Sequence, residues 1–227
     1  TVHEAEGYWV AGFVAMASPC EILLDTGDGQ LAKRLADLAA HEAWRIEQKY
    51  SRYREDGIIP AINRSGGIPV AVDDETAMLL DFAFYCYRLS DGLFDITSGV
   101  LRRVWRFDGS DNIPSQRQID EILPLVGLTR VQWQKPHICL LPGMEIDLGG
   151  IGKEYAADRV MQCLQEQTDL SMLVNFGGDI VANKGRANGQ AWQVGIELKD
   201  RHDQADKVLR ISAGGVAVEL VGTYDPM

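Results

Sequence analysis

The segment best suited to chemistry is a carboxylate followed by glycines and a lysine, Asp147-Leu148-Gly149-Gly150-Ile151-Gly152-Lys153. It leads directly into a segment with helical spacing. Glycines let a backbone approach a phosphate closely, and a helix N-terminus adds unpaired N–H groups and partial positive charge. An anion therefore fits this loop: Lys153 would add a point charge, and Asp147 would accept from a base or a ribose hydroxyl. The alternative interpretation is an ordinary tight turn with a solvated lysine.

Two other loops combine acids, hydroxyls and glycines. Asp91–Gly99 holds an acid and two hydroxyls after a predicted helix, where a ligand's polar groups could be held. A plain capping role for Asp95 and Thr97 is an equally good interpretation. In Asn175–Asp179 an apolar strand meets paired glycines and an acid, which indicates either a close backbone approach or simply a turn.

Several well-known sites are absent from the sequence. Glu154 follows the lysine where Walker A needs Ser or Thr, and no G-x-G-x-x-G pattern is present. The four histidines show no H-x-x-x-H spacing, and there is no G-x-S-x-G elbow, so zinc sites and hydrolase triads are unsupported. Four separated cysteines without a C-x-x-C pair predict buried, reduced thiols.

Long helices that alternate with short strands predict an α+β fold to position these loops. Helices are expected at Leu31–Tyr50, Glu75–Tyr87, Gln118–Val126 and Gly152–Glu166, and strands at Tyr8–Ala15, Cys20–Leu24, Val131–Gln134, Ile138–Leu141, Met172–Asn175, Ile180–Ala182, Trp192–Glu197 and Val208–Ile211. Asp73 and Asp74 give the second helix a good N-terminal start, and Ser115 is the expected N-cap of the third.

Composition and charge narrow the partners. The 227 residues predict one compact domain, with two lobes as the alternative. Thirty-three acidic against twenty-two basic residues give a formal charge of −11, which disfavours nucleic acid and anionic membranes. No apolar run is long enough to span a bilayer, and Thr1–Ser18 lacks the pattern of a signal peptide. We therefore expect a cytoplasmic protein, or a periplasmic or membrane-associated one if a signal has been removed.

Taken in order, these loops resemble the motifs of the ApbE family of FAD:protein FMN transferases, from Ala15 to about Leu209. The residues that carry the resemblance lie in five segments. Ala15–Glu21 is similar to the opening A-M-G-[ST] strand, Tyr50–Asn63 to F-S-x-Y-R-x-D-S and L-N, Phe94–Phe107 to F-D-[PIV]-T-[VS]-G and W-x-F, Asp147–Asp158 to D-L-G-G-[IF]-[AG]-K-G-[YW]-[AI]-x-D, and Asn175–Ile180 to N-x-G-G-D-[IL].

The resemblance implies an ApbE/T-fold-like α+β fold, with mixed antiparallel sheets packed against helices, and it implies roles for particular residues. Met16 and Tyr53 would line the flavin nucleotide site. FAD would be held by Leu93, Phe94 and Asp95 and contacted by Asp147 and Lys153, and the backbone carbonyl of Gly150 would be a Mg²⁺ ligand.

The family reaction, as the resemblance implies it, cuts the pyrophosphate of FAD, moves FMN onto a threonine or serine hydroxyl of an acceptor flavoprotein, and releases AMP. Mg²⁺ would neutralise the charge on the phosphates. Positioning and electrostatics do most of the work in phosphoryl transfer, so the enzyme needs no nucleophile of its own. FAD and the acceptor protein are therefore the expected partners, and the absence of a catalytic triad counts little against this function.

The resemblance breaks down near the end of the sequence. Leu220 and Val221 stand where the family has Thr-Ser, and neither side chain can donate a hydrogen bond. Gly57 and Glu154 are smaller departures. The late family elements that supply further Mg²⁺ ligands do not follow, so we expect a single ApbE-like domain, 1–227, that is C-terminally incomplete.

Three accounts of the incomplete domain stay open: a fragment of a longer enzyme, a truncated product, or a binding protein that keeps FAD without transferring FMN. FAD hydrolysis to FMN and AMP is a further alternative activity, with water in place of the acceptor hydroxyl. Missing strands would expose sheet edges, which a partner or a second copy in a homodimer would cover.

Overall fold

The computed structural model describes residues 1–106, 113–196, 207–212 and 216–219. The chain separates into two compact units. Unit 1 comprises Thr1–Glu47 and Lys153–Met227, and unit 2 comprises Gln48–Gly152. Helices and antiparallel sheets occur in both, which confirms the α+β class predicted from the sequence. Within the described ranges, no helix is long and apolar enough to cross a membrane.

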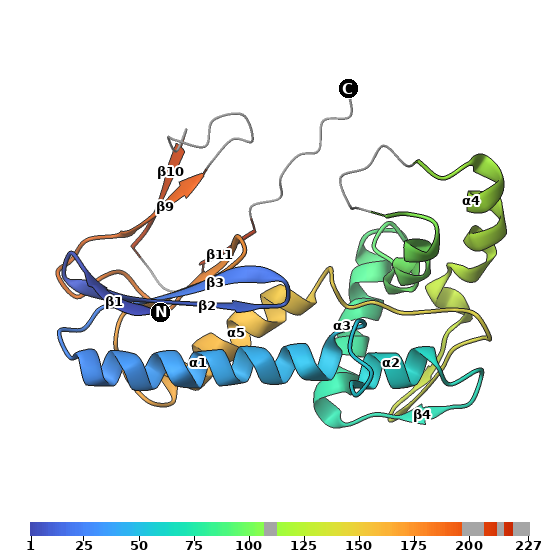
Figure 1. Ribbon diagram of the computed structural model, residues 1–227, viewed down its shortest axis with the longest axis horizontal. Coiled ribbons are helices and arrows are strands. Elements are labelled where there is room, and N and C mark those ends of the chain that lie inside the picture. The colour runs from blue at the N-terminus through green and yellow to red at the C-terminus, as the bar shows by residue number, and fades with distance from the viewer. Residues whose placement is uncertain (107–112, 197–206, 213–215, 220–227) are drawn as a thin grey trace. The chain divides into compact units, whose positions relative to one another are not determined.

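Unit 1 is built on a six-stranded antiparallel sheet (Figure 1). Its strands, in spatial order, are β1 (Val2–Ala5), β2 (Tyr8–Ala15), β3 (Ser18–Leu24), β7 (Met172–Phe176), β8 (Asp179–Ala182) and β11 (Val216–Glu219). The predicted Tyr8–Leu24 hairpin is therefore confirmed, and residues from the far end of the chain pair with it. The Asn175–Asp179 loop is the turn between β7 and β8.

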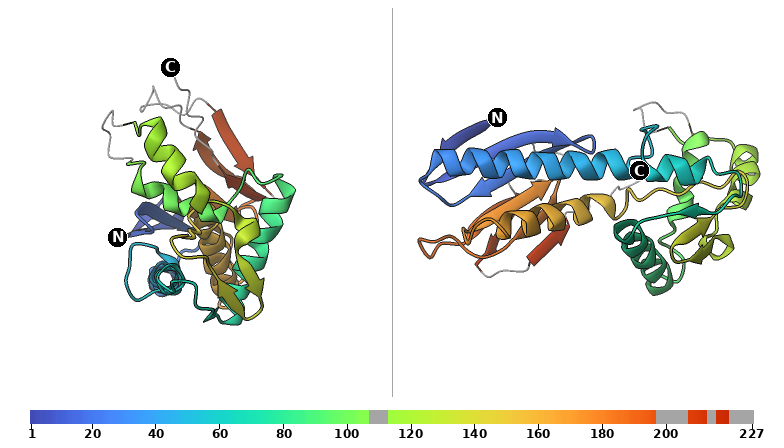
Figure 2. Two further views of the ribbon diagram at one scale, coloured as in Figure 1. Left: turned by 90° about the vertical axis from the view of Figure 1, so that its right-hand side faces the viewer. Right: turned by 90° about the horizontal axis from the view of Figure 1, so that it is seen from below.

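Helices α1 (Gly29–Tyr50) and α5 (Gly152–Gln165) cover one face of this sheet, as Figures 1 and 2 both show. Residues of α1 up to Glu47 belong to unit 1. Of the apolar residues that predicted α1 from their helical spacing, Leu35, Ala39 and Ala43 are buried, whereas Trp44 is 46% exposed. The buried side chains of α1 form the core of unit 1 together with buried sheet residues such as Ile22.

A smaller two-stranded sheet, β9 (Trp192–Ile196) with β10 (Lys207–Ile211), completes the described part of unit 1. Trp192 anchors it in a cluster of buried apolar side chains, and the Tyr8 ring meets the Trp192 ring edge-on at 5.5 Å. The predicted strand Trp192–Glu197 is confirmed up to Ile196, and Glu197 lies outside the described residues.

Unit 2 contains shorter elements around a three-stranded antiparallel sheet of order β4-β6-β5. They are α2 (Ile58–Asn63), β4 (Val70–Ala71), α3 (Asp74–Leu89), the 3-10 helix η1 (Ile96–Arg103), α4 (Gln116–Ile122), the 3-10 turns η2 (Leu123–Leu125) and η3 (Leu128–Arg130), β5 (Gln132–Gln134) and β6 (His137–Cys139). The core includes Ile59, Ile62, Leu80, Ile138 and Ile146, all essentially inaccessible to solvent.

Helix ends in unit 2 follow the sequence signals with one exception. Asp73 caps α3 by accepting from the Thr76 backbone, and Ser115 forms a capping box with Gln118 at the start of α4. The prediction that α4 reaches Val126 is wrong, because α4 ends at Ile122. Pro124 supplies no backbone N–H to continue the α-helical ladder, so the chain tightens into η2.

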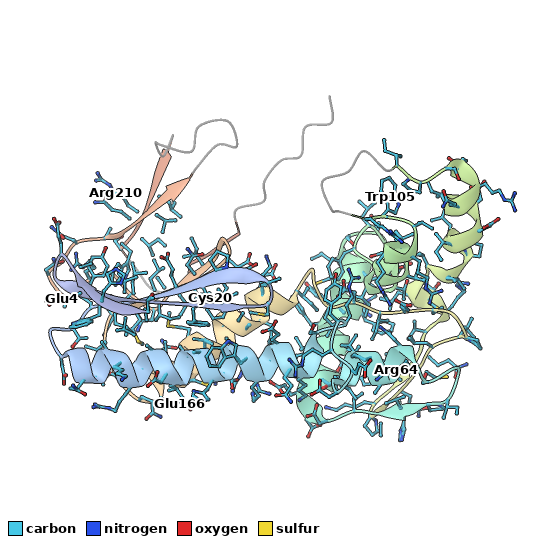
Figure 3. The ribbon with its side chains drawn as sticks, in the orientation of Figure 1. Glu4, Cys20, Arg64, Trp105, Glu166 and Arg210 are labelled. Atoms are coloured by element: carbon cyan, nitrogen blue, oxygen red, sulfur yellow. The ribbon has the colours of Figure 1, made fainter. Side chains whose placement is uncertain are left out.

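All four cysteines are free, as the sequence predicts, but only Cys20 is fully buried. Cys20 lies on β3 (Figure 3), and burial raises the pKa of its thiol to about 11. Such a thiol is inert at neutral pH. The other three cysteines are half-buried, so the expectation of buried thiols holds for one of the four.

Candidate functional site

The centre of the candidate site in unit 2 is an ion pair between Arg52 and Asp147. Arg52 Nη1 lies 2.8 Å from Asp147 Oδ2, with 18% and 27% of the two side chains exposed. Arg52 Nη2 donates to the Tyr53 hydroxyl at 2.8 Å, and the guanidinium lies 4.9 Å from the centre of the Tyr53 ring. One arginine therefore orients both a carboxylate and an aromatic ring that the sequence singled out.

The backbone around Asp147 is fixed by two neighbouring segments. The Asn63 side-chain amide donates to the Ile146 carbonyl and accepts from the Ile146 N–H, at 3.0 and 2.8 Å. Asp147 N–H donates to the Ile96 carbonyl at 2.8 Å, at the start of η1. The Asp147 carboxylate is thus held at a defined position before any ligand binds.

Close packing of Gly99 against Asp147 explains why the Asp95–Gly99 motif ends in glycine. A Cβ placed at Gly99 would lie 2.8 Å from the Asp147 Cβ and 3.1 Å from the Asp147 nitrogen. Arg52 Nη1 also lies 3.4 Å from the Gly99 carbonyl oxygen. The backbone of η1 therefore passes directly against Asp147, which no larger residue at position 99 would allow.

The glycine turn after Asp147 follows the same logic. Gly149 N–H donates to Asp147 Oδ1 at 3.1 Å, so both carboxylate oxygens of Asp147 have a partner within unit 2. A Cβ at Gly150 would lie 2.9 Å from the ring of Phe94. This brings Gly150, predicted as a Mg²⁺ ligand, beside Phe94, predicted to hold FAD.

Asp95 has a structural role, which is the alternative that the sequence left open. Its Oδ1 accepts from the Thr97 N–H and hydroxyl at 2.8 and 2.6 Å, and its Oδ2 accepts from the Leu128 N–H at 3.0 Å. It is the N-cap of η1. The predicted contact of Asp95 with FAD stays a prediction.

Two residues of the predicted flavin site are large side chains left in solvent. Tyr53 is 79% exposed and Leu93 is 92% exposed. Leu93 follows Asp91 and Gly92, which both have positive φ, at 52° and 84°. An aromatic ring and an aliphatic side chain presented in this way suit contact with a flat apolar ligand.

In unit 1, Met16 lies in the turn that joins β2 to β3. Ala15 pairs with Ser18, and both central residues have positive φ, 52° for Met16 and 56° for Ala17. Such a two-residue turn favours Asn-Gly, and non-glycine residues in this region carry strain of about 1–2 kcal/mol each. Strain of this kind accumulates at functional sites, in keeping with the predicted ligand role of Met16.

Lys153 lies in the first turn of α5 and faces Asp179 in the same unit. Its Nζ is 3.7 Å from Asp179 Oδ2, an oxygen that is buried without a hydrogen bond among the described residues. The turn before Asp179 is tight, since Gly177 has φ +65° and a Cβ there would lie 2.9 Å from the Ser18 Cβ. Lys153 is therefore neither fully solvated nor free of a counter-charge.

The two ends of the Asp147–Lys153 loop fall in different units, because unit 2 ends at Gly152. Asp147, Gly150, Tyr53, Leu93, Phe94 and Asp95 belong to unit 2, and Met16 and Lys153 belong to unit 1. The structure thus groups the unit 2 residues around Arg52 and η1, and the unit 1 residues around the β2–β3 and β7–β8 turns.

The residues that the structure describes supply only part of a Mg²⁺ site. Mg²⁺ prefers six oxygen ligands, and the Gly150 region offers a backbone carbonyl close in sequence to one carboxylate, already paired with Arg52. Within those ranges, no group of three or more His, Cys, Asp or Glu side chains could hold a metal ion. These residues alone do not complete a magnesium site.

Sequence reasoning missed Arg52 and Asp179 as partners of the predicted residues. Arg52 occupies a variable position of the resembled motif, and its link to Asp147 is created by the fold. A signal for Asp179 was present, since an acid that follows paired glycines matches the motif around Asn175. Its pairing with Lys153 depends on the contact between α5 and the β7–β8 turn.

Comparisons with known proteins show the family of the chain. The family model described as the ApbE family matches residues 16–225. The FAD:protein FMN transferase of Salmonella typhimurium is 29% identical over 207 residues, which cover 85% of this chain and 58% of that protein. The protein of the same name from Treponema pallidum is 30% identical over 199 residues, covering 79% of this chain and 54% of that protein.

Solved structures give the same result for the fold. The ApbE protein of Thermotoga maritima superimposes with a TM-score of 0.82 at 28% identity, over 91% of this chain and 68% of that one. The flavinyl transferase ApbE of Pseudomonas stutzeri, at 22% identity, has a TM-score of 0.75 over 92% of this chain and 70% of that one, and shares the fold. The chain spans 58% or less of the two curated relatives above. Because the family model covers nearly all of it, the chain belongs to the ApbE family.

Proposed function

We propose that this chain carries the flavin-binding part of an FAD:protein FMN transferase. In that reaction a threonine or serine hydroxyl oxygen of an acceptor protein bonds to the phosphorus of the FMN half. The pyrophosphate P–O bond breaks, AMP leaves with the electron pair, and the hydroxyl proton is released. The names of the curated relatives support this function.

The observation that carries the proposal is the fixed position of Asp147. Its backbone is held at the start of η1, its carboxylate is paired with Arg52, and a glycine turn follows it. Asp147 would accept a hydrogen bond from the dinucleotide, and exposed Tyr53 and Leu93 would contact its apolar parts. A preorganised site costs little free energy to order when a ligand binds.

Mg²⁺ is part of the proposal rather than of the described site. When bound, the ion would neutralise charge on the phosphates of FAD. The Gly150 carbonyl would supply one ligand, and the other ligands would come from outside the described residues or from the substrate itself. Loss of AMP release on chelation of the ion tests this dependence.

Two alternatives use the same binding site. Water in place of the acceptor hydroxyl would give FAD hydrolysis to FMN and AMP. Leu220 and Val221, which stand where the family has Thr-Ser and lie outside the described residues, favour a protein that binds FAD without turnover. The three activities differ in their products, so one assay separates them.

The assay follows flavin fluorescence and AMP in one sample of the 227-residue chain with FAD, with Mg²⁺ or EDTA. An acceptor protein that a curated relative modifies is included or omitted. Magnesium-dependent AMP together with flavin bound covalently to the acceptor is the expected result. AMP with free FMN would identify hydrolysis, and bound FAD without AMP would identify a binding protein. Absence of FAD binding under all conditions would overturn the proposal.

Replacement of Arg52 tests whether the positioned Asp147 matters for binding. Arg52→Gln leaves Asp147 without its cation and Tyr53 without its donor, so we expect FAD to bind at least tenfold more weakly. Arg117→Gln is the matched control, because Arg117 lies on α4 with its side chain 88% exposed and, among the residues that the structure describes, pairs only with Glu121. Equal FAD affinity in the two variants would remove Arg52 from the site.

A further inference from the structure

Helix α3 carries a second apolar stripe that faces solvent. One face of the helix is buried in unit 2 through residues such as Leu79, Leu80 and Ala83. The opposite face presents four large apolar side chains at intervals of four, three and four residues. They are Met78, Phe82, Tyr85 and Leu89, with 51%, 49%, 52% and 71% of their surface exposed. We call them the α3 stripe; the helix is labelled in Figure 1.

The α3 stripe is as large as the apolar patches that often have a function. Its two aromatic rings stack with their centres 6.5 Å apart, which makes a continuous surface. About half the area of four such side chains is on the order of 400 Å², comparable to the largest apolar patch of a typical monomer. The four-three-four spacing is that of the seam by which one helix packs against another helix.

The charges beside the stripe specify how a second helix would pair with it. Exposed Asp74 and Asp81 lie in the N-terminal half of α3, and exposed Arg88 lies in the C-terminal half. By helical periodicity all three flank the same side of the stripe. Arg88 has no ion-pair partner among the described residues, and Asp81 accepts from Trp133 Nε1 through one carboxylate oxygen at 2.6 Å.

We propose that the α3 stripe is the interface of a homodimer in which two copies of α3 pack antiparallel across a two-fold axis. With the axis between Phe82 and Tyr85, each Phe82 meets Tyr85 of the second copy, and each Met78 meets its Leu89. The two-fold axis brings like flanks together, so Arg88 of each copy lies next to Asp81 of the other. The stripe and its charges are therefore complementary to themselves.

Parallel pairing would lack the charge pairs that favour the antiparallel dimer. A two-fold axis along the helices would put the charged flanks of the two copies on opposite sides of the seam, so no Asp81–Arg88 pair would form, and the two helix dipoles would be aligned. The contact area sets the strength of the dimer. The stripe gives each copy about half of the roughly 800 Å² per partner that is usual in stable complexes. We expect a weak dimer that forms in the micromolar range or above. This interface does not depend on the flavin chemistry.

Sedimentation velocity of the full 227-residue chain from about 5 to 500 μM tests the stripe. Wild type is expected to shift from monomer to dimer. Phe82→Glu should weaken association at least tenfold, and Ile68→Glu, at a 70% exposed site elsewhere in unit 2, should leave it unchanged. Thermal unfolding confirms that each variant folds. A wild-type chain that stays monomeric would overturn the proposal and leave a different protein as the occupant of the stripe. Equal effects of the two substitutions would also overturn it.

Charge exchange tests the antiparallel register. Arg88→Glu and Asp81→Arg should each weaken dimerisation about three- to tenfold, because each places like charges together at two symmetry-related positions. The double variant restores opposite charges and should regain most of the wild-type affinity. Additive losses in the double variant would contradict the antiparallel dimer, because in it residues 81 and 88 of the two copies lie within one helical turn of each other.

Disulfide trapping provides an independent readout. A mixture of Met78→Cys and Leu89→Cys chains should cross-link under mild oxidation, whereas each single variant alone should cross-link no more than wild type. Cross-linking by Met78→Cys alone would indicate parallel pairing and overturn the antiparallel dimer. Wild type is the control for the native cysteines.

Discussion

Asp95 shows how a residue chosen for its chemistry is first required by the fold. Its two carboxylate oxygens join η1, through Thr97, to the backbone at Leu128. Thr97 is completely buried and its hydroxyl accepts from the Gly127 N–H at 2.7 Å, so the network extends between two loops. A substitution at Asp95 therefore changes the framework of the site whether or not Asp95 touches a ligand.

Asp95→Asn separates these roles. The amide keeps one acceptor oxygen and loses the other, which leaves a backbone donor unpaired, so we expect the free energy of unfolding to fall by about 1–3 kcal/mol. Asp91→Asn is the control, because Asp91 has φ 52° and asparagine tolerates that conformation equally well. Urea unfolding measures both. Wild-type stability in Asp95→Asn together with lost FAD binding would show that Asp95 is a ligand residue and not a structural one.

Glu145 makes the stability of unit 2 depend on pH. Burial alone would raise the pKa of this carboxyl. Hydrogen bonds from Arg103 and Arg102 lower the pKa by more than burial raises it, so the net pKa lies below its usual value. A carboxyl group whose pKa is lower in the folded state stabilises the fold at pH values above the ordinary pKa of glutamate. This stabilisation is lost as the pH falls through the folded-state pKa.

We therefore expect the free energy of unfolding to drop between about pH 5 and pH 3, and Glu145→Gln to reduce the size of that drop. Glu121→Gln, at an exposed pair on α4, should keep the wild-type slope. Chemical unfolding at a series of pH values gives both slopes. If the Glu145→Gln profile matches the wild-type profile, another group governs acid unfolding.

At the level of elements, the tight approach of η1 to Asp147 depends on Gly99. In Gly99→Ala the new methyl group would lie 2.8 Å from the Asp147 Cβ and 3.1 Å from its backbone nitrogen, so the chain must move. We expect a loss of about 1–3 kcal/mol of stability from overpacking, together with weaker FAD binding. In Gly27→Ala nothing lies within 4 Å of the new methyl, and stability should change little.

Thermal unfolding and FAD titration of these two glycine variants provide the measurement. Equal stability in both would mean that η1 moves away from Asp147 without cost. Loss of stability with unchanged FAD affinity would mean that the position of Asp147 is not needed for binding.

The elements that the sequence predicted well are those whose signal is local. Helix α1 could be predicted because its apolar residues repeat with helical spacing and pack on the sheet. The sequence predicts its start at Leu31, and in the structure it begins at Gly29. The capping residues Asp73 and Ser115 mark their helix starts because each side chain accepts a hydrogen bond from a backbone N–H three residues ahead.

Elements held by distant contacts escaped prediction. The motif around Asp95 predicts a loop where η1 begins, because the start of η1 depends on Asp95 bonded to the distant Leu128. Short α2 is held through Asn63, whose side chain bonds to Ile146 far along the chain. The Arg52–Asp147 pair in the candidate site is of the same kind, so the motifs indicated Asp147 without its partner.

At the scale of the whole molecule, the uninterrupted segment Gln48–Gly152 forms unit 2, and in the sequence it lies between the two segments that build unit 1. Unit 2 has its own buried core and its own sheet, and its first residues bond within it. Lys49 contacts Asp73 and Glu75 at 2.5 and 2.6 Å, and these bonds raise the pKa of Lys49 despite the opposing effect of burial. Unit 2 thus has the contacts of an independently folding domain.

We therefore expect a chain of residues 48–152 alone to fold cooperatively, with dispersed amide resonances and a single urea transition. Lys49→Ala should lower the free energy of unfolding of this chain by about 1–2 kcal/mol, because two carboxylates lose their cation. Lys135→Ala, whose partner Asp74 is 95% exposed, is the matched control and should have little effect. A chain that binds hydrophobic dyes and unfolds without cooperativity would show that unit 2 depends on unit 1 for its stability. In that case the Arg52–Asp147 pair would be preorganised by the whole molecule and not by the segment that contains it.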